Sequence, residues 1–262
     1  MSDRRQRQKE QRAAKRETER KQESRRELGR RLLTALIFGV VVIGIFAIGG
    51  VFSGENSDVP GTYEDYRGQE TACGAEQPPA EQVMSFDAPE TQTDITPSSE
   101  VVATVATSCG EIVIDLNSDG APETVNSFVF LAREGYYDGQ VIHRISEDFV
   151  FQTGDPSADG TGGPGYVVAD EFPEAEFEYE EGVVAMANRG TRSTGSQFFV
   201  VTGPDGRFLT NQFTVFGRVA SGQETIDRIM AVETATAPGS REQSRPLETV
   251  YIESITIDVA DS

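Results

Sequence analysis

Residues Leu32–Phe52 most constrain how this chain can fold, because these 21 residues contain no charged side chain. At about 1.5 Å per residue, a helix of this length spans about 31 Å, which matches the roughly 30 Å hydrocarbon core of a bilayer. The preceding residues 1–31 carry 13 Lys or Arg against six Asp or Glu. Since basic flanks stay on the cytoplasmic side, the pattern predicts a single-pass cell-membrane protein with a basic cytoplasmic head (1–31), a transmembrane helix (32–52) and the rest of the chain outside.

The main alternative for this run is a cleaved signal peptide. Such peptides have an apolar core of about 7–15 residues and a small-residue cleavage site of the A-x-A type. Here the apolar run is longer, and the sequence that closes it reads Gly49-Gly50-Val51-Phe52-Ser53. A buried core helix also fits less well, because the run is apolar all round and has a strongly basic flank. We therefore expect an uncleaved anchor.

Residues 53–99 differ sharply from the basic head, with ten acidic residues, one Arg and no persistent period. This composition predicts an acidic, Pro-containing tether that is mostly without regular structure. As a flexible chain it would span about 40 Å on average. The two cysteines of the chain are Cys73 in this tether and Cys109 beyond it. In an oxidising exterior they are expected to form a disulfide, and the alternative is two unrelated thiols.

Composition excludes several functions for residues 100–262. This part contains nine Arg, no Lys and 27 acidic residues, which argues against nucleic-acid binding. His143 is the single histidine of the chain, so no site with several His ligands can form. Two cysteines are too few for a four-Cys zinc site or for an iron–sulfur cluster.

The same region predicts a mainly β domain. Pro122 suits the first position of a helix that ends near Gly135, and Ser221 with Glu224 forms a capping-box pattern for a second helix. Two helices cannot supply the crossovers of a parallel sheet, so we expect a closed eight-stranded antiparallel β-barrel capped by two α-helices. The expected strands are Val101–Thr107, Glu111–Leu116, Gln140–Ser146, Phe149–Thr153, Val183–Ala187, Gln197–Thr202, Phe213–Val219 and Thr249–Val259.

Two conspicuous motifs have a simple structural interpretation. The glycine-rich run from Gly160 to Gly165 matches G-x-G-x-x-G, but no strand precedes it and no helix follows, so it indicates an irregular loop and not a dinucleotide site. The run Asp170–Glu181 has seven acids in twelve residues without the spacing of an EF-hand, and it indicates a solvated acidic loop.

Arg144 is harder to explain structurally, because it lies in the apolar run Val141-Ile142-His143-Arg144-Ile145. Strand alternation places His143 and Arg144 on opposite faces. An Arg in such a strand must face a polar cleft or pair with another group. Arg144 is therefore a candidate functional residue.

An ordered set of motifs surrounds this arginine. The set consists of His143-Arg144-Ile145, Phe149, Gln152-x-Gly154-Asp155, Gly160-Thr161-Gly162-Gly163, Met186-Ala187-Asn188, Gly195-Ser196-Gln197-Phe198-Phe199 and Val215-Phe216-Gly217. In order and spacing the set resembles the cyclophilin family of peptidyl-prolyl isomerases, from about Val101 to Val259. The head, the span and the Cys-containing tether are similar to those of membrane-anchored cyclophilins of actinobacteria.

The resemblance implies a proline-binding groove on the outer face of the barrel. Arg144 would be the catalytic group, and Gln152 would orient it and contact the substrate. Ala187 and Asn188 would bind the residue before proline, and Gln197 would shape the neighbouring specificity pocket. The apolar proline pocket would consist of Phe149, Val150, Phe199, Leu209 and Phe213.

The sequence departs from the usual family pattern at three positions. Val150 stands where the family usually has Met, Phe208 where many members have Trp, and Phe213 where many have His. All three keep the substrate-binding surface apolar. With Phe208 in place of Trp, the resemblance implies weak binding of cyclosporin, since a phenyl ring has no N–H donor.

The resemblance implies an enzyme that assists the folding of extracytoplasmic proteins and needs no cofactor or metal. Its partners would be proline-containing polypeptides. The alternative is a non-catalytic proline-peptide-binding or scaffold module of the cell envelope. Arg144 distinguishes the two, because a pure binding module does not need it.

Overall fold

The computed structural model of the chain describes residues 59–80, 84–237 and 240–260. The predicted basic head and membrane span lie outside these ranges. Within them, no helix combines the length and the apolar character that crossing a membrane requires.

The domain is built on one eight-stranded sheet in the order β10-β1-β2-β7-β5-β6-β4-β3, with antiparallel neighbours throughout. A separate two-stranded sheet pairs β8 with β9. The strands are β1 (Glu100–Thr107), β2 (Gly110–Leu116), β3 (Arg144–Ser146), β4 (Val150–Thr153), β5 (Val183–Met186), β6 (Phe198–Val201), β7 (Val215–Ser221), β8 (Thr234–Thr236), β9 (Gln243–Pro246) and β10 (Ile252–Ala260).

The predicted closed barrel is wrong, because the sheet is curled but open. Its edge strands, β10 and β3, share no ladder in the described part of the chain. Residues 139–142 make backbone hydrogen bonds to residues 250–252, and Val141 and Tyr251 form an isolated bridge. The physical reason is the length of β3: the predicted strand Gln140–Ser146 shortens to three residues, which pair with β4 and leave no run to pair with β10.

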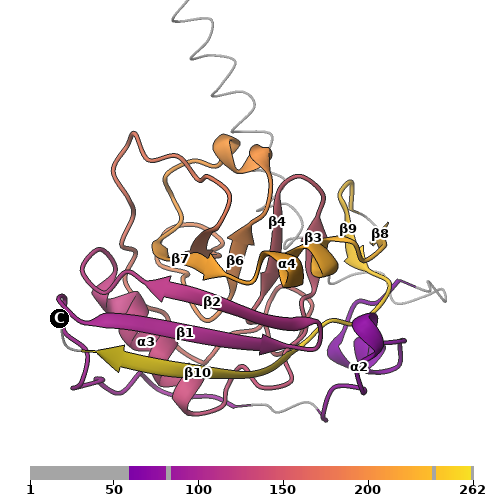
Figure 1. The fold of residues 1–262 in the computed structure, drawn as a ribbon, viewed down its shortest axis with the longest axis horizontal. Helices are drawn as coiled ribbons and strands as arrows, with labels where there is room; N and C mark the ends of the chain where they lie inside the picture. Colours follow the sequence, from indigo (N-terminus) through magenta and orange to yellow (C-terminus); the bar gives the residue numbers. More distant parts are fainter. Residues whose placement is uncertain (1–58, 81–83, 238–239, 261–262) are drawn as a thin grey trace, which may run out of the picture.

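Two helices pack on the inner face of this sheet (Figure 1). The first, α3 (Pro122–Arg133), begins with Pro at N1 as expected and buries Val125, Phe128 and Leu131. The second, α4 (Gln223–Met230), buries Ile226 and Ile229. Its predicted capping box is wrong, because the N-cap is Gly222 at φ 107° with no side-chain cap. A side chain there would meet the backbone of Glu111 at 2.5 Å, so the close approach of β2 demands glycine.

The alternation of side chains along β4, β5 and β6 separates two apolar layers. Phe151, Val184 and Phe198 belong to the main core with α3 and α4. Their neighbours Val150, Ala185 and Phe199 belong to a second cluster on the opposite face of the sheet. Because both faces are covered, every residue of these three strands is buried.

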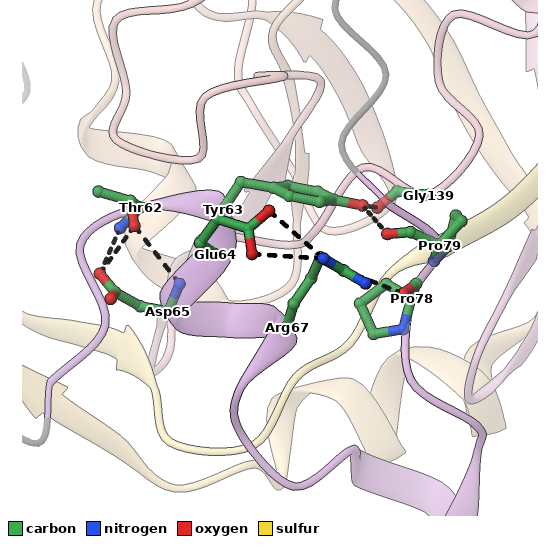
Figure 2. Close-up of polar contacts among 8 residues, drawn as sticks. All are labelled: Thr62, Tyr63, Glu64, Asp65, Arg67, Pro78, Pro79 and Gly139. Carbon is green, nitrogen blue, oxygen red and sulfur yellow. Dashed lines mark hydrogen bonds and ion pairs between the residues drawn. The ribbon is translucent and has the colours of Figure 1, made fainter.

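The described part of residues 53–99, the predicted tether, lies against the domain. It contains α2 (Tyr63–Arg67) and a short 3-10 helix, η1 (Ala72–Gly74). Thr62 and Asp65 form a capping box at the start of α2, and the Tyr63 hydroxyl donates to the carbonyl of Gly139 at 2.8 Å (Figure 2). The buried Tyr66 hydroxyl donates to the carbonyl of His143 at 3.1 Å, next to Arg144. Two tyrosines in an otherwise polar stretch thus attach it to the domain.

A disulfide joins the same segment to the β1–β2 turn. Cys73 in η1 is bonded to Cys109, with their Cα atoms 5.2 Å apart. Cys109 is buried in the main core, and its carbonyl accepts a hydrogen bond from Arg228 of α4 at 2.7 Å. The predicted cysteine pair is therefore within bonding geometry, and the bond closes 36 residues of chain onto the domain.

Candidate active site

Strand register places the candidate residues in one row across four strands. Arg144 of β3 is paired with Gln152 of β4, Gln152 with Phe199 of β6, and Phe199 with Ala185 of β5. Cross-strand partners point to the same face of a sheet. The row therefore brings a cation, an amide and an aromatic ring to the outer face, although 55 residues of sequence separate Arg144 from Phe199.

Most of the predicted proline pocket belongs to the apolar cluster on this face. Phe199 and Phe213 meet edge to face, with ring centroids 5.5 Å apart. Phe208 is not a member; it ends the 3-10 helix η2 (Pro204–Phe208), and the Arg207 guanidinium lies over its ring. The cluster consists of Phe149, Val150, Tyr179, Val183, Ala185, Phe199, Val201 and Phe213, with Phe177, Ala187, Leu209 and Val215 packed against it.

Arg144 lies at the border of this cluster. Its guanidinium carbon is 5.4 Å from the centroid of the Phe149 ring. Its Nη1 donates to Oε1 of Gln152 at 3.3 Å. Its Nε and Nη2 donate to the carboxylate of Glu242 at 3.0 and 2.6 Å, and the two side chains are only 11% and 13% exposed. The arginine is thus fixed on three sides.

Gln152 connects the arginine to a recess. Its Nε2 donates to Oε1 of Gln197 at 2.9 Å, and Nε2 of Gln197 donates to the carbonyl of Gly162 at 2.9 Å. A pocket of about 300 Å³ lies between the glycine-rich loop 160–167 and residues 187–197, and Ala187, Asn188 and Gln197 line it. The residues predicted to bind the substrate ahead of proline therefore surround one recess beside the apolar cluster.

The ionisable groups at the site have a simple electrostatic arrangement. Burial, and then the charges of Arg245 and Arg144, lower the pKa of His143 well below its usual value, so this histidine is neutral at pH 7. Burial raises the pKa of Glu242. The charge and hydrogen bonds of Arg144, together with the Ser146 and Ser244 hydroxyls, outweigh this effect, so the net pKa of Glu242 lies below its usual value. Glu242 is an ionised partner of Arg144 at neutral pH.

Sequence reasoning missed two residues of this site. Glu242 precedes β9, 98 residues after Arg144, in a hairpin that carries no strong strand pattern. Tyr179 lies in the run that was predicted to be a solvated acidic loop, yet it is buried, and its hydroxyl donates to the carbonyl of Phe213 at 2.7 Å. The only available signal was the aromatic pair Phe177 and Tyr179 at alternate positions among the acids.

A sheet with a cation, an amide and an apolar cluster on its outer face defines a class of protein. The sequence model of the family "Cyclophilin type peptidyl-prolyl cis-trans isomerase/CLD" matches residues 102–257, which is more than half of the chain. The chain belongs to this family, and it is a peptidyl-prolyl cis-trans isomerase.

Curated relatives carry the same activity in their names. Peptidyl-prolyl cis-trans isomerase B of Streptomyces anulatus is 39% identical over 179 residues, which are 62% of this chain and 98% of the relative. A probable peptidyl-prolyl cis-trans isomerase B of Mycobacterium tuberculosis is 36% identical over 195 residues, 69% of this chain and 62% of the relative.

Solved structures show the same fold. A cyclophilin-type peptidyl-prolyl cis-trans isomerase of Cryptosporidium parvum superposes with a TM-score of 0.54 at 25% identity, over 61% of this chain and 98% of that one. The same protein was also crystallised in the presence of the dipeptide Ala-Pro.

Proposed function

We propose that Arg144 is the catalytic group of this isomerase and that the outer-face cluster holds the proline ring of the substrate. The row Arg144–Gln152–Phe199 carries the proposal, because it sets a cation at the border of an apolar cluster. In this proposal the proline ring binds against Phe149, Val150, Phe199, Leu209 and Phe213, and Gln152 orients the arginine. Ala187, Asn188 and Gln197 bind the residue before proline.

The chemistry requires no bond to be made or broken. Rotation about an X–Pro bond is slow because the nitrogen lone pair is shared with the carbonyl, which gives a barrier of about 18–20 kcal/mol. In the twisted transition state this lone pair is localised on nitrogen. A guanidinium N–H placed at that nitrogen stabilises the twisted state more than either planar state, and this difference accelerates rotation.

The sheet suits this reaction because it can hold the proline ring in place while the preceding peptide group rotates. The pocket of Phe149 and Phe199 is rigid, since its members are buried strand residues or pack against them. A proline ring held there stays fixed while the preceding carbonyl turns. The recess beside Gln197 binds the preceding residue, so the substrate is oriented at both ends of the rotating bond.

Substitution of Arg144 tests this role. In the full-length protein, Arg144→Ala should lower the catalysed rate of cis–trans exchange of an Ala-Pro peptide, measured by NMR, by about a hundredfold or more. This is the size of effect seen when an enzyme loses one hydrogen-bond donor that stabilises its transition state. An unchanged rate in a folded variant would refute the role of Arg144. A matched control is Arg218→Ala, because Arg218 is an exposed arginine of β7 whose side chain contacts Glu180 and Glu181 and not the site.

We further propose that the catalytic domain works outside the cytoplasm, attached to the membrane by residues 32–52, and assists the folding of extracytoplasmic proteins. The Cys73–Cys109 bond supports an oxidising compartment, and the basic head supports a cytoplasmic N-terminus. Protease added to intact spheroplasts should digest the domain. Digestion only after lysis would contradict this topology.

A further inference from the structure

The carboxylate of Glu242 holds the proposed catalytic arginine on its Nε and Nη2 side. The role of Glu242 rests on the catalytic role proposed for Arg144. The Glu242 carboxylate accepts two hydrogen bonds from Arg144, one from Nε and one from Nη2, in a bidentate contact. The side-chain oxygen of Gln152 accepts one hydrogen bond from Nη1 of the arginine. A guanidinium has five N–H groups, so two remain, one on Nη1 and one on Nη2. We propose that Glu242 is a positioning residue that fixes the plane of Arg144 and keeps Nη1 directed at the groove.

Glu242 is itself held before any substrate binds. The Ser244 hydroxyl donates to its Oε2 at 3.1 Å, and its backbone N–H donates to the Ser240 hydroxyl at 3.0 Å. The next residues of β9 are also attached, because Arg245 donates to the carbonyl of Ala158 at 2.8 Å. The β8–β9 hairpin therefore presents the carboxylate at a defined place, and a bidentate contact to a planar guanidinium transmits that orientation to Arg144.

Arg144 also starts a hydrogen-bond chain that leads to the recess beside Gln197. Arg144 donates to Gln152, Gln152 donates to Gln197, and Gln197 donates to the carbonyl of Gly162. Each amide must present its oxygen toward the arginine side and its nitrogen away from it. Since a guanidinium has no acceptor, Arg144 can act only as the donor that starts this chain. Glu242 acts on this chain only through the guanidinium that it holds.

Glutamine at position 242 tests the proposal with little change in volume. Its amide nitrogen would meet an N–H of Arg144, so one of the two contacts is lost and the guanidinium turns. In the full-length protein, kcat for an Ala-Pro peptide should fall about tenfold or more, with KM within about twofold, because the contact matters for the transition state. The Arg144 Nε–Hε NMR resonance should move upfield as its carboxylate acceptor is removed.

Two further variants complete the test. Glu242→Asp keeps the charge but is one methylene shorter, and it should recover part of kcat. The matched control is Glu233→Gln, which removes one exposed carboxylate just before β8 and should change neither kcat nor the Nε–Hε resonance.

Several outcomes would overturn the proposal. An unchanged or higher kcat in Glu242→Gln would show that Glu242 does not position Arg144 for catalysis. An equal loss in Glu242→Asp and Glu242→Gln, without movement of the Nε–Hε resonance, would show a structural role only. If Glu242→Gln does not fold, an unchanged kcat in folded Glu242→Asp overturns it. Arg144→Ala measured in parallel separates the two claims: no loss there refutes the role of Arg144 itself.

Discussion

The disulfide that attaches residues 59–80 to the domain should contribute substantially to its stability. Cys73 and Cys109 are separated by 36 residues. In the chain-entropy model, a closed loop of that length restricts the unfolded chain by about 3.8 kcal/mol at 25 °C. For a domain of this size, each kcal/mol shifts Tm by about 2–4 °C, so removing the bond should lower Tm by roughly 8–15 °C.

The measurement compares thermal unfolding of the wild type with that of Cys73→Ala/Cys109→Ala, each with and without a reductant. Replacing both residues avoids a stray thiol. The reductant should lower Tm of the wild type toward that of the double variant, and it should leave the double variant unchanged. Equal Tm values for the oxidised wild type and the double variant would refute the reasoning. They would mean that the hydrogen bonds of Tyr63 and Tyr66 already hold the segment in place.

Three further perturbations have defined outcomes. Tyr179→Phe should lower the free energy of unfolding by about 1–3 kcal/mol in urea titrations, because the Phe213 carbonyl loses its buried partner; an unchanged midpoint at equal m-value would contradict this. Phe208→Trp should tighten inhibition by cyclosporin roughly ten- to hundredfold at a similar isomerase rate, since an indole N–H becomes available; unchanged inhibition would refute the assignment of Phe208. Glu171 accepts two N–H groups in the first turn of α3, so Glu171→Gln should cost about 0.5–1 kcal/mol in low salt and less in high salt; a cost independent of salt would exclude a charge effect.

The strands could be predicted from the sequence because alternation and turn residues act locally. The predicted runs Val101–Thr107 and Glu111–Leu116 correspond closely to β1 and β2. Closure of the sheet could not be predicted in this way, because it depends on how far β3 extends toward β10. The capping box at Ser221 failed for a related reason: the close approach of β2 to Gly222, a tertiary contact, decides where α4 begins.

The site shows the same division between local and long-range information. The motifs around Arg144 and Gln197 indicated candidate site residues, several of which the sheet register brings together. Glu242 was missed because its importance depends on a fold that places the β8–β9 hairpin beside β3. Tyr179 was missed because net charge dominated the interpretation of residues 170–181, although charges on one side of a segment leave its other side free to pack.

The most direct test of the account compares binding with catalysis in Arg144→Ala. A cation that acts on the twisted imide should contribute little to the affinity for planar substrate. The dissociation constant of an Ala-Pro peptide should therefore change by less than about threefold, while the catalysed exchange rate falls by about a hundredfold or more. If affinity and exchange rate fall by the same factor, Arg144 only binds the peptide, and the proposed transition-state role is wrong.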